Sequence, residues 1–484
     1  MGNVLDKLSP ENVFEYFEEI SAIPRTTGDM DAIRAYIIAF AEENLLSCKS
    51  DEYGNIVIYK AASWGYEAQE PVIIQCHLDM ICEKNYDIEF KHDSKKDPLK
   101  LAVMDEYIFA KGTSLGADDG IGAAYMLALL SDDSLDHPPI EAVFTVDAQN
   151  GMAGAASFDF SLLSGKRMIN LDHSVEGEIL TSSAGGRKVK CTFGVNIENY
   201  TGVKYNLVIS GLAGGHSGIE IDKGRGNANI LMGRFVHYIA KRIPIKVGYL
   251  KGGLSDTLIP REAKAEIYIE EKYVDTAENL ISEFVAIIEK EYGDVEDNLT
   301  MYGENLGLES TIVLDDESQR KVGLLINAVP DGIIKMSRNG DDLVQTSLNC
   351  GIMRLHRDHF DLIINLRSLS SSEMEALSDK LQYLTEAVGG NYTIESDYPA
   401  WEYTEESDFR ETAFDIYQRC FEKNPRITGF HSGLECGIFF KNIKGIDIIS
   451  FGPDITGINT PKERLYIPSA QRTYELLVEI LANC

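Results

Sequence analysis

The pattern of apolar and polar positions divides the chain into three stretches of different character. Before about residue 190, short apolar runs of strand length alternate with segments that repeat apolar residues at helical spacing. The strand-like runs are residues 54–61, 71–80, 140–148 and 167–173, and the helical segments are residues 9–23, 28–45 and 118–133. Alternation of this kind predicts an α/β sheet with helices on both faces.

The middle of the chain has a different pattern. Longer runs with partial period-two alternation, such as residues 203–211 and 343–368, predict strands, and helical segments separate them. The helical segments are residues 226–243, 275–293, 318–329 and 371–389. After about residue 390, helix and strand alternate again. We therefore expect a discontinuous α/β domain with a mixed sheet, residues 1–188 and 390–484, interrupted by an inserted α+β domain, residues 189–389.

Composition and charge narrow the range of partners. The 484 residues include 45 basic and 77 acidic side chains, a formal net charge of −32. So much negative charge repels nucleic acid and anionic lipid, so we expect neither as a partner. No apolar run approaches the roughly 18 residues that a membrane-spanning helix needs. Eight cysteines occur without a CxxC pair, and the start lacks an apolar signal segment, which favours the cytoplasm.

Candidate chemistry gathers where the expected strands end. His77 and Asp79 stand two apart at the end of one strand, which predicts that they face the same side. Asp118 and Asp119 follow a glycine-rich turn and open an apolar helix, and Asp172 follows another strand. Acids at a helix start are also ordinary caps. One imidazole and several carboxylates at the strand ends nevertheless favour a metal site.

Eight motifs, in order from residue 77 to 457, give the chain a specific resemblance. They are HLDM, GTSLGADDGIG, INLDHSVEGEI, AGGHSG, IPREA, TSLNCG, HSGLECG and FGPDITG. The chain resembles the aminoacyl-histidine dipeptidases, also called Xaa-His or cytosolic non-specific dipeptidases, a branch of the M20 metallopeptidase clan. The resemblance implies a zinc-peptidase-like catalytic domain with two metals, an inserted lid domain, hydrolysis of dipeptides in the cytoplasm, and a homodimer.

The resemblance also implies roles for individual residues. His77, Asp118 and Asp172 match one metal site, in which Asp118 is the bridging carboxylate, and Asp79 matches the catalytic acid that orients His77. His216 matches the lid histidine that binds the substrate or polarises its carbonyl. The substrate-binding candidates are Arg367, for the substrate carboxylate, and His431 and Glu435, in the HSGLECG segment.

Three positions expected to carry the general base and second-metal ligands depart from the family pattern, and a smaller departure is Thr257, where the family has an asparagine. The family has two adjacent glutamates, a general base and a ligand of the second metal, where this chain has Ala148 and Gln149. The family has a further histidine ligand where this chain has Asn459. Shifting the alignment does not restore them, because the chain has no histidine after His431 and no glutamate between residues 141 and 176.

These departures set the functional expectation. We expect one divalent metal, Zn²⁺ or Mn²⁺, a doubtful second metal, and a dipeptide-like ligand whose hydrolysis is lost or much reduced. Neutral amides at Gln149 and Asn459 would bind a second metal weakly and could instead donate hydrogen bonds to Asp118. Two alternatives stay open. One is a single-metal hydrolase with Asp147, Glu435 or His173 as base, and the other is a non-catalytic ligand- or partner-binding protein.

Overall fold

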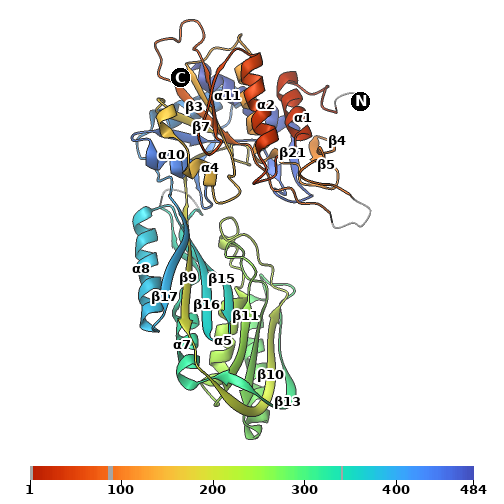
Figure 1. The fold of residues 1–484 in the computed structure, drawn as a ribbon, viewed down its shortest axis with the longest axis vertical. Helices are drawn as coiled ribbons and strands as arrows, with labels where there is room; N and C mark the ends of the chain where they lie inside the picture. The colour runs from red at the N-terminus through yellow and green to blue at the C-terminus, as the bar shows by residue number, and fades with distance from the viewer. Residues whose placement is uncertain (1–3, 86–90, 339–341) are drawn as a thin grey trace. The chain divides into compact units, whose positions relative to one another are not determined.

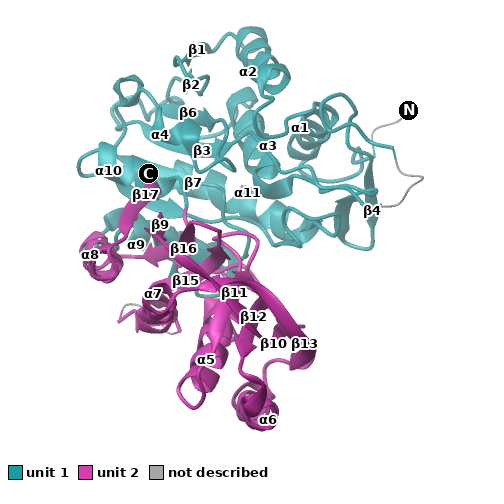
Figure 2. Cartoon of the chain, turned by 60° about the horizontal axis from the view of Figure 1, so that its bottom comes forward, with its two compact units in different colours: residues 1–183, 401–429, 434–484 teal, residues 184–400, 430–433 magenta. Residues whose placement is uncertain are grey.

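The chain folds into two compact units in a computed structural model that describes residues 4–85, 91–338 and 342–484. Unit 1 comprises residues 1–183, 401–429 and 434–484, and unit 2 comprises residues 184–400 and 430–433 (Figure 2). The predicted domain limits, 188/189 and 389/390, stay a prediction. Within the described residues, no helix is long and apolar enough to cross a membrane.

Unit 1 is built on an eight-stranded mixed sheet, as predicted, with strand order β1-β2-β6-β3-β7-β19-β8-β18 (Figure 1). The central strands β6, β3, β7 and β19 run parallel, whereas β1, β2 and β8 join their neighbours antiparallel. The strands are β1 Ser47–Ser50, β2 Ile56–Lys60, β3 Val72–His77, β6 Ile140–Thr145, β7 Arg167–Asn170, β8 Glu178–Ser183, β18 Arg426–Phe430 and β19 Asp447–Ser450. The parallel strands therefore end at one common edge.

Helices bury both faces of the unit 1 sheet. Every residue of β3 and of β6 is buried, as expected for strands covered on two sides. The helices are α1 Glu11–Ala22, α2 Asp31–Glu43, α3 Ala117–Ser131, α4 Ala153–Ala156, η1 Phe160–Leu162, α9 Asp408–Phe421, α10 Cys436–Asn442 and α11 Ile467–Ala482. A small sheet comprises β4 Leu101–Met104, β5 Tyr107–Ala110, β20 Ile455–Thr456 and β21 Arg464–Tyr466. The predicted buried helix is α3, whose apolar residues are all buried.

Unit 2 is an antiparallel sheet with helices against it, in agreement with the predicted α+β module. The strand order is β13-β10-β12-β11-β15-β16-β9-β17, and β14 pairs with β15. The strands are β9 Gly185–Gly194, β10 Ile197–Ser210, β11 Lys246–Gly252, β12 Ala263–Ile269, β13 Thr300–Leu314, β14 Gly332–Met336, β15 Val344–Leu355, β16 His359–Ser368 and β17 Asn391–Tyr398. The helices are η2 Ile221–Lys223, α5 Ala228–Ala240, η3 Glu271–Tyr273, α6 Val274–Tyr292, α7 Asp316–Ala328 and α8 Ser371–Ala387.

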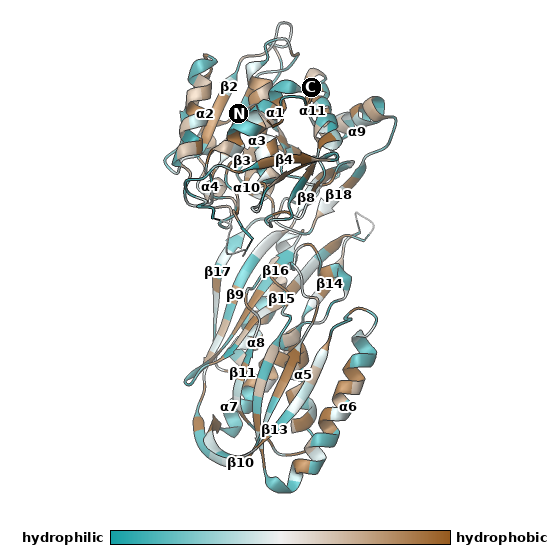
Figure 3. Ribbon diagram, turned by 90° about the vertical axis from the view of Figure 1, so that its right-hand side faces the viewer, coloured by the Kyte–Doolittle hydropathy of each residue, from teal (hydrophilic) through white to brown (hydrophobic). Residues whose placement is uncertain are grey.

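The two faces of the unit 2 sheet differ in polarity. On β16, Phe360, Leu362 and Ile364 belong to the core shared with the helices. The alternate residue Asp361 instead pairs with Lys190 of β9, and Lys204 of β10 pairs with Glu266. Figure 3 shows the resulting alternation of brown and teal along the strands and along α6. The helix-free face of unit 2 is therefore polar and carries charged side chains.

The core of unit 1 predicts unequal costs for truncating two apolar side chains. Ile74 in β3 is completely buried, so Ile74→Ala is expected to cost about 2–5 kcal/mol of unfolding free energy through lost burial and a cavity. Leu45 is 93 % exposed, so Leu45→Ala serves as the control, with an expected change within about 0.5 kcal/mol. Guanidinium unfolding followed by circular dichroism measures both. Equal costs would contradict the assigned core.

Candidate functional site

His77, Asp118 and Asp172 converge at the carboxyl edge of the parallel strands in unit 1. His77 ends β3, Asp172 lies two residues beyond β7, and Asp118 lies in the first turn of α3, where the backbone is not helical. The His77 Nε2 atom lies 3.3 Å from Asp118 Oδ1 and 3.6 Å from Asp172 Oδ1. One ligand atom from each residue lies within 4.8 Å of the others. The three residues predicted to form a metal site are thus brought together.

The donor set fits one divalent cation. Nitrogen and oxygen ligands at about 2.0–2.2 Å from a tetrahedral Zn²⁺ lie about 3.3–3.6 Å from each other, which is the spacing that His77 makes with both carboxylates. Burial and the charge of Asp118 raise the pKa of Asp172 despite its contact with His77. Carboxylates held this close repel one another, and a cation relieves that repulsion.

A further acidic residue, Asp119, adds to the negative charge of this cluster when it is ionised. Asp119, directly after Asp118, is buried and accepts a hydrogen bond from the backbone N–H of His77 at 3.2 Å. Burial and the charges of Asp172 and Asp118 raise the pKa of Asp119 well above its usual range. Burial alone lowers the pKa of His77, but the carboxylates of Asp118, Asp172 and Asp79 accept hydrogen bonds from the charged imidazole and raise its pKa well above the usual range.

Asp79 anchors the loop in which Ala148 and Gln149 stand where the family has two glutamates. The strand β3 ends at His77, so Asp79 lies beyond it, and the expectation that both residues belong to the strand is wrong. The His77 Nδ1 atom makes its hydrogen bond, 2.9 Å, with the Asp79 carbonyl oxygen. The Asp79 carboxylate accepts the backbone N–H groups of Ala148 at 2.8 Å and Gln149 at 3.1 Å, and the Thr27 hydroxyl at 2.8 Å. Burial alone would raise its pKa, but these bonds and His77 lower the pKa of Asp79 to about 2.

Of the two amide residues at the expected second-metal positions, Gln149 and Asn459, only Gln149 makes the contact with Asp118 that we expected. Gln149 donates from Nε2 to Asp118 Oδ2 at 3.4 Å, which is the amide contact expected in place of a second cation. Asn459, by contrast, has a left-handed backbone with φ of 61°, and no described residue forms a hydrogen bond with its side chain. Only one of the two amides therefore compensates Asp118.

Two residues that the sequence pattern did not reveal fix the position of Asp118. Glu463 is buried, and its carboxylate accepts the backbone N–H groups of Leu115, Gly116 and Ala117 at 2.9–3.0 Å and that of Asp118 at 3.4 Å. Arg25, also buried, donates to the carbonyl oxygens of Gly116 and Leu78 at 2.5 and 2.8 Å. No local periodicity marks either residue, because both act across more than 50 positions of sequence.

The three alternative bases differ in how far they are already engaged. Asp147 accepts the backbone N–H of Gly28 at 2.8 Å, and His173 Nε2 lies 3.0 Å from Glu178 Oε2. Glu435 is buried, and its Oε2 accepts hydrogen bonds from Gln75 at 2.6 Å and Thr145 at 2.5 Å. Its Oε1 has no hydrogen-bond partner among the described residues. Burial raises the pKa of Glu435 to about 8, even though the charge of His77 opposes the shift.

A second group of candidate residues lies within unit 2. A Cβ atom placed on Gly218 would lie 3.0 Å from Arg367 Cζ, 3.1 Å from His216 Cε1 and 3.1 Å from Ser432 Oγ. These three side chains therefore border one small space that the glycine leaves open. Burial and the charge of Arg367 lower the pKa of His216 to about 4, so its imidazole is neutral at pH 7.

Arg367 is a buried cation with no counter-ion among the described residues. Its side chain, 4 % exposed, donates from Nη1 to the Tyr398 hydroxyl at 2.9 Å. Its Nε makes no hydrogen bond within the described part of the chain, where no carboxylate pairs with the guanidinium. Buried charges normally have a partner, so this arrangement suits an anionic group of a ligand.

His431 belongs to the same unit and is held by β15. Its Nε2 lies 2.7 Å from the Ser347 hydroxyl, and the residue is buried. Burial and the nearby charge of Arg367 lower the pKa of His431 to about 3. The imidazole is therefore neutral in the folded chain over the physiological range.

The lowered pKa of His431 predicts acid sensitivity. The neutral form is favoured by folding, so the stabilisation is complete above the unfolded pKa of about 6.5 and is lost as pH falls from there toward about 3. The stability gap between wild type and His431→Gln should shrink by about 2 kcal/mol between pH 7 and pH 5, because glutamine does not titrate. Urea unfolding at the two pH values measures this gap. His237→Gln, at an exposed position of α5, is the control, and a constant gap for His431→Gln would contradict the assignment.

Comparisons with known proteins identify the family to which the chain belongs. A family model described as a peptidase dimerisation domain of M20 type matches residues 208–296. The cytosol non-specific dipeptidase of Escherichia coli is 34 % identical over 99 % of this chain and 98 % of its own length. The crystal structure of aminoacylhistidine dipeptidase from Vibrio alginolyticus superimposes with a TM-score of 0.88 at 32 % identity, covering 99 % of this chain and 98 % of that one. An aminopeptidase PepT from Bacillus cereus, 15 % identical with a TM-score of 0.57, covers 98 % of both chains and shares the fold. The chain belongs to the aminoacyl-histidine dipeptidase family of M20 metallopeptidases.

Proposed function

We propose that this chain is a dipeptidase-type scaffold that binds one divalent metal and a dipeptide-like ligand, and whose hydrolytic activity is lost or much reduced. The observation that carries the proposal is the loop after β6. Its backbone is anchored to Asp79 beside the His77 cluster, yet its side chains there are those of Ala148 and Gln149. The chain therefore keeps the family's framework while lacking its proton acceptor at that position.

His77, Asp118 and Asp172 would hold the metal, which we expect to be Zn²⁺ or Mn²⁺. When bound, the metal would act as a Lewis acid toward the ligand's carbonyl group. A second metal would need Gln149 and Asn459 as ligands, and both are neutral amides. Gln149 already donates its amide hydrogen to Asp118, which makes Asp118 less available as a bridge.

The loss at position 148 removes a proton transfer. A methyl group neither accepts a proton nor orients water, whereas a general base contributes about 10²–10⁴-fold to the rate. Asp147, the neighbouring acid, is occupied by the Gly28 N–H and has a left-handed backbone with φ of 54°. We infer that no residue of this turn replaces the missing glutamate.

Arg367 supports a ligand with a free carboxylate, and the neutral His216 bordering the same space could donate a hydrogen bond to a carbonyl oxygen. A dipeptide offers both groups. The dimerisation-domain match supports a homodimer, and the relative named as a cytosol enzyme supports a cytoplasmic location.

A single-metal hydrolase that uses Glu435 is the second candidate. The unpartnered Oε1 of this buried carboxyl group favours it over Asp147 and His173. Its pKa of about 8, raised by burial, leaves it mostly protonated at pH 7, so it would serve as a base only in alkaline solution. An activity that rises above pH 8, is abolished by chelator and is lost in Glu435→Gln would favour this candidate.

Restoring the family residues should restore the reaction. The triple variant Ala148→Glu, Gln149→Glu, Asn459→His is expected to bind one more Zn²⁺ per chain and to hydrolyse a Xaa-His dipeptide about 10²–10⁴-fold faster than wild type. Calorimetric titration and a ninhydrin assay of released amino acid measure the two effects.

The matched control for the restoration carries Gln at position 148 with the other two changes. Glutamine has nearly the volume of glutamate but accepts no proton, so this variant should regain the metal without the rate. A wild-type rate equal to that of the restored triple variant would contradict the proposal that activity is lost.

The unpaired guanidinium of Arg367 predicts which end of a ligand it binds. Arg367→Met should weaken the binding of a free dipeptide about 10–100-fold by removing a charge-assisted hydrogen bond, and should barely affect a C-terminally amidated dipeptide. Calorimetry with both peptides measures the difference, and Arg242→Met, at an exposed position, is the control. Equal weakening for both peptides would rule out carboxylate recognition.

A further inference from the structure

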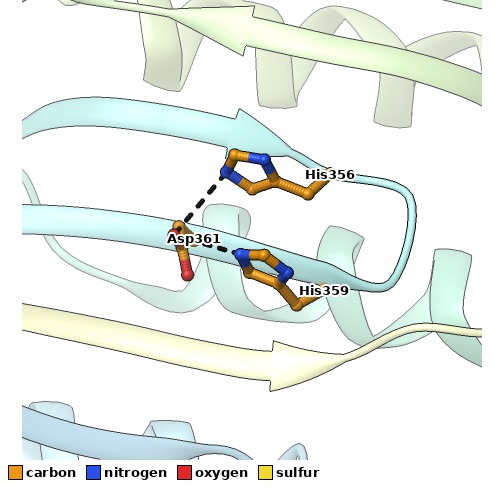
Figure 4. A group of neighbouring side chains, drawn as sticks. All are labelled: His356, His359 and Asp361. Carbon is orange, nitrogen blue, oxygen red and sulfur yellow. Dashed lines mark ion pairs between the residues drawn. The ribbon is translucent and has the colours of Figure 1, made fainter.

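A second cluster of metal-ligating side chains lies in unit 2, on the turn that joins β15 to β16. It consists of His356, His359 and Asp361, and one ligand atom of each lies within 4.8 Å of the others (Figure 4). The His359 Nε2 atom lies 3.5 Å from Asp361 Oδ2, and the His356 Nε2 atom lies 3.7 Å from the same oxygen. We propose that this cluster, which we call the hairpin site, binds a late first-row divalent metal such as Zn²⁺.

The local sequence explains why the three side chains meet. His356 and His359 flank a tight turn of two residues, closed by a hydrogen bond of 2.8 Å from the His356 N–H to the His359 carbonyl oxygen. His359 and Asp361 stand two apart on β16, so both point to the helix-free face of the sheet. The two imidazole rings stack with centroids 4.2 Å apart and planes 13° apart. The backbone of the hairpin thus holds the three side chains close together without the help of a metal.

The distances agree with the coordination geometry of zinc. Ligand atoms around a tetrahedral Zn²⁺ lie about 3.3–3.6 Å apart, so the contact of His359 with Asp361 already fits and that of His356 is only slightly long. The comparable contacts of His77 in unit 1 are 3.3 and 3.6 Å. Two imidazoles and one carboxylate favour Zn²⁺, Cu²⁺ or Ni²⁺ over the oxygen-seeking Mg²⁺ and Ca²⁺.

A neighbouring acid orients one of the ligands. The Nδ1 atom of His359 lies 2.6 Å from Asp358 Oδ1, and a proton shared there leaves the lone pair of Nε2 directed toward Asp361. Histidines that bind metals commonly donate their other N–H to a carboxylate in this way. Asp358 therefore acts as a positioning residue for the hairpin site.

Lys190 is the competitor of the metal. Its ammonium lies 2.8 Å from Asp361 Oδ2, the same oxygen that faces both histidines. The Lys190 side chain is 31 % exposed, so it can swing into solvent when a divalent cation takes its place. Asp361 itself is 6 % exposed, which keeps its carboxylate in place for either cation.

Because Lys190 and the metal compete for Asp361, some substitutions should weaken zinc binding and another should strengthen it. In full-length protein carrying His77→Ala, which removes the imidazole of the unit 1 cluster, calorimetric titration should still show one Zn²⁺ per chain. His359→Ala should abolish that binding and Asp358→Ala should weaken it about 10–100-fold. Lys190→Met should strengthen it about tenfold, because a nearby positive charge is removed.

Controls keep a folding defect apart from a binding defect. His237→Ala, an exposed histidine of α5, should leave the titration unchanged. If His77→Ala fails to fold by circular dichroism, His359→Ala in the wild-type chain should lower the zinc stoichiometry by one, and Lys190→Met should tighten the site that depends on His359. The absence of zinc binding that depends on His359, or the failure of Lys190→Met to strengthen it, would overturn the hairpin site. Neither result bears on the dipeptidase proposal, which rests on unit 1 and Arg367.

Discussion

Electrostatic repulsion among buried and half-buried carboxylates is the constraint around which unit 1 is organised. Asp79, Asp118, Asp119 and Asp172 gather around the single imidazole of His77, at the ends of β3 and β7 and the start of α3. Such a cluster is stable only if donors or cations offset the charges. The loop after β6 supplies N–H groups to Asp79, the Gln149 amide reaches Asp118, and the His77 imidazole lies against Asp118 and Asp172. Each of these contacts compensates charge as well as positioning a side chain.

The same constraint explains why the framework persists beside the missing base. Having alanine at position 148 in place of the family's glutamate keeps the backbone N–H that binds Asp79, because this hydrogen bond comes from the main chain. A glutamate can therefore be lost at this position with little effect on folding. Loss of Asp79 would be a different matter, since it would remove the acceptor of the Ala148 and Gln149 N–H groups and the shorter acceptor of the Thr27 hydroxyl.

Sequence patterns predicted the fold class and the strand ends at which His77, Asp118 and Asp172 gather, whereas their grouping as metal ligands came from the family resemblance and stays a prediction. Period-two and helical periodicities define the elements, and strand ends followed by Asp172 or His77 show where polar groups collect. The limits of prediction are equally physical. Nothing in the run around Asp79 shows that β3 ends two residues earlier. The contributions of Glu463 and Arg25 come from contacts between distant segments. The turn H-R-D-H-F-D does contain a readable signal, but only its pairing across the hairpin shows that His356 faces Asp361.

The loop near the C-terminus contains two residues, Asn459 and Glu463, that serve different purposes. Asn459 stands where the family has a ligand, while Glu463, four residues later, receives four backbone N–H groups from the segment that carries Asp118. The position of the metal ligand and the residue that supports the fold are therefore different side chains of one short loop. A chain can lose the ligand and still need the supporting glutamate in order to fold. Sequence similarity across this loop consequently reports a shared fold more faithfully than a shared reaction.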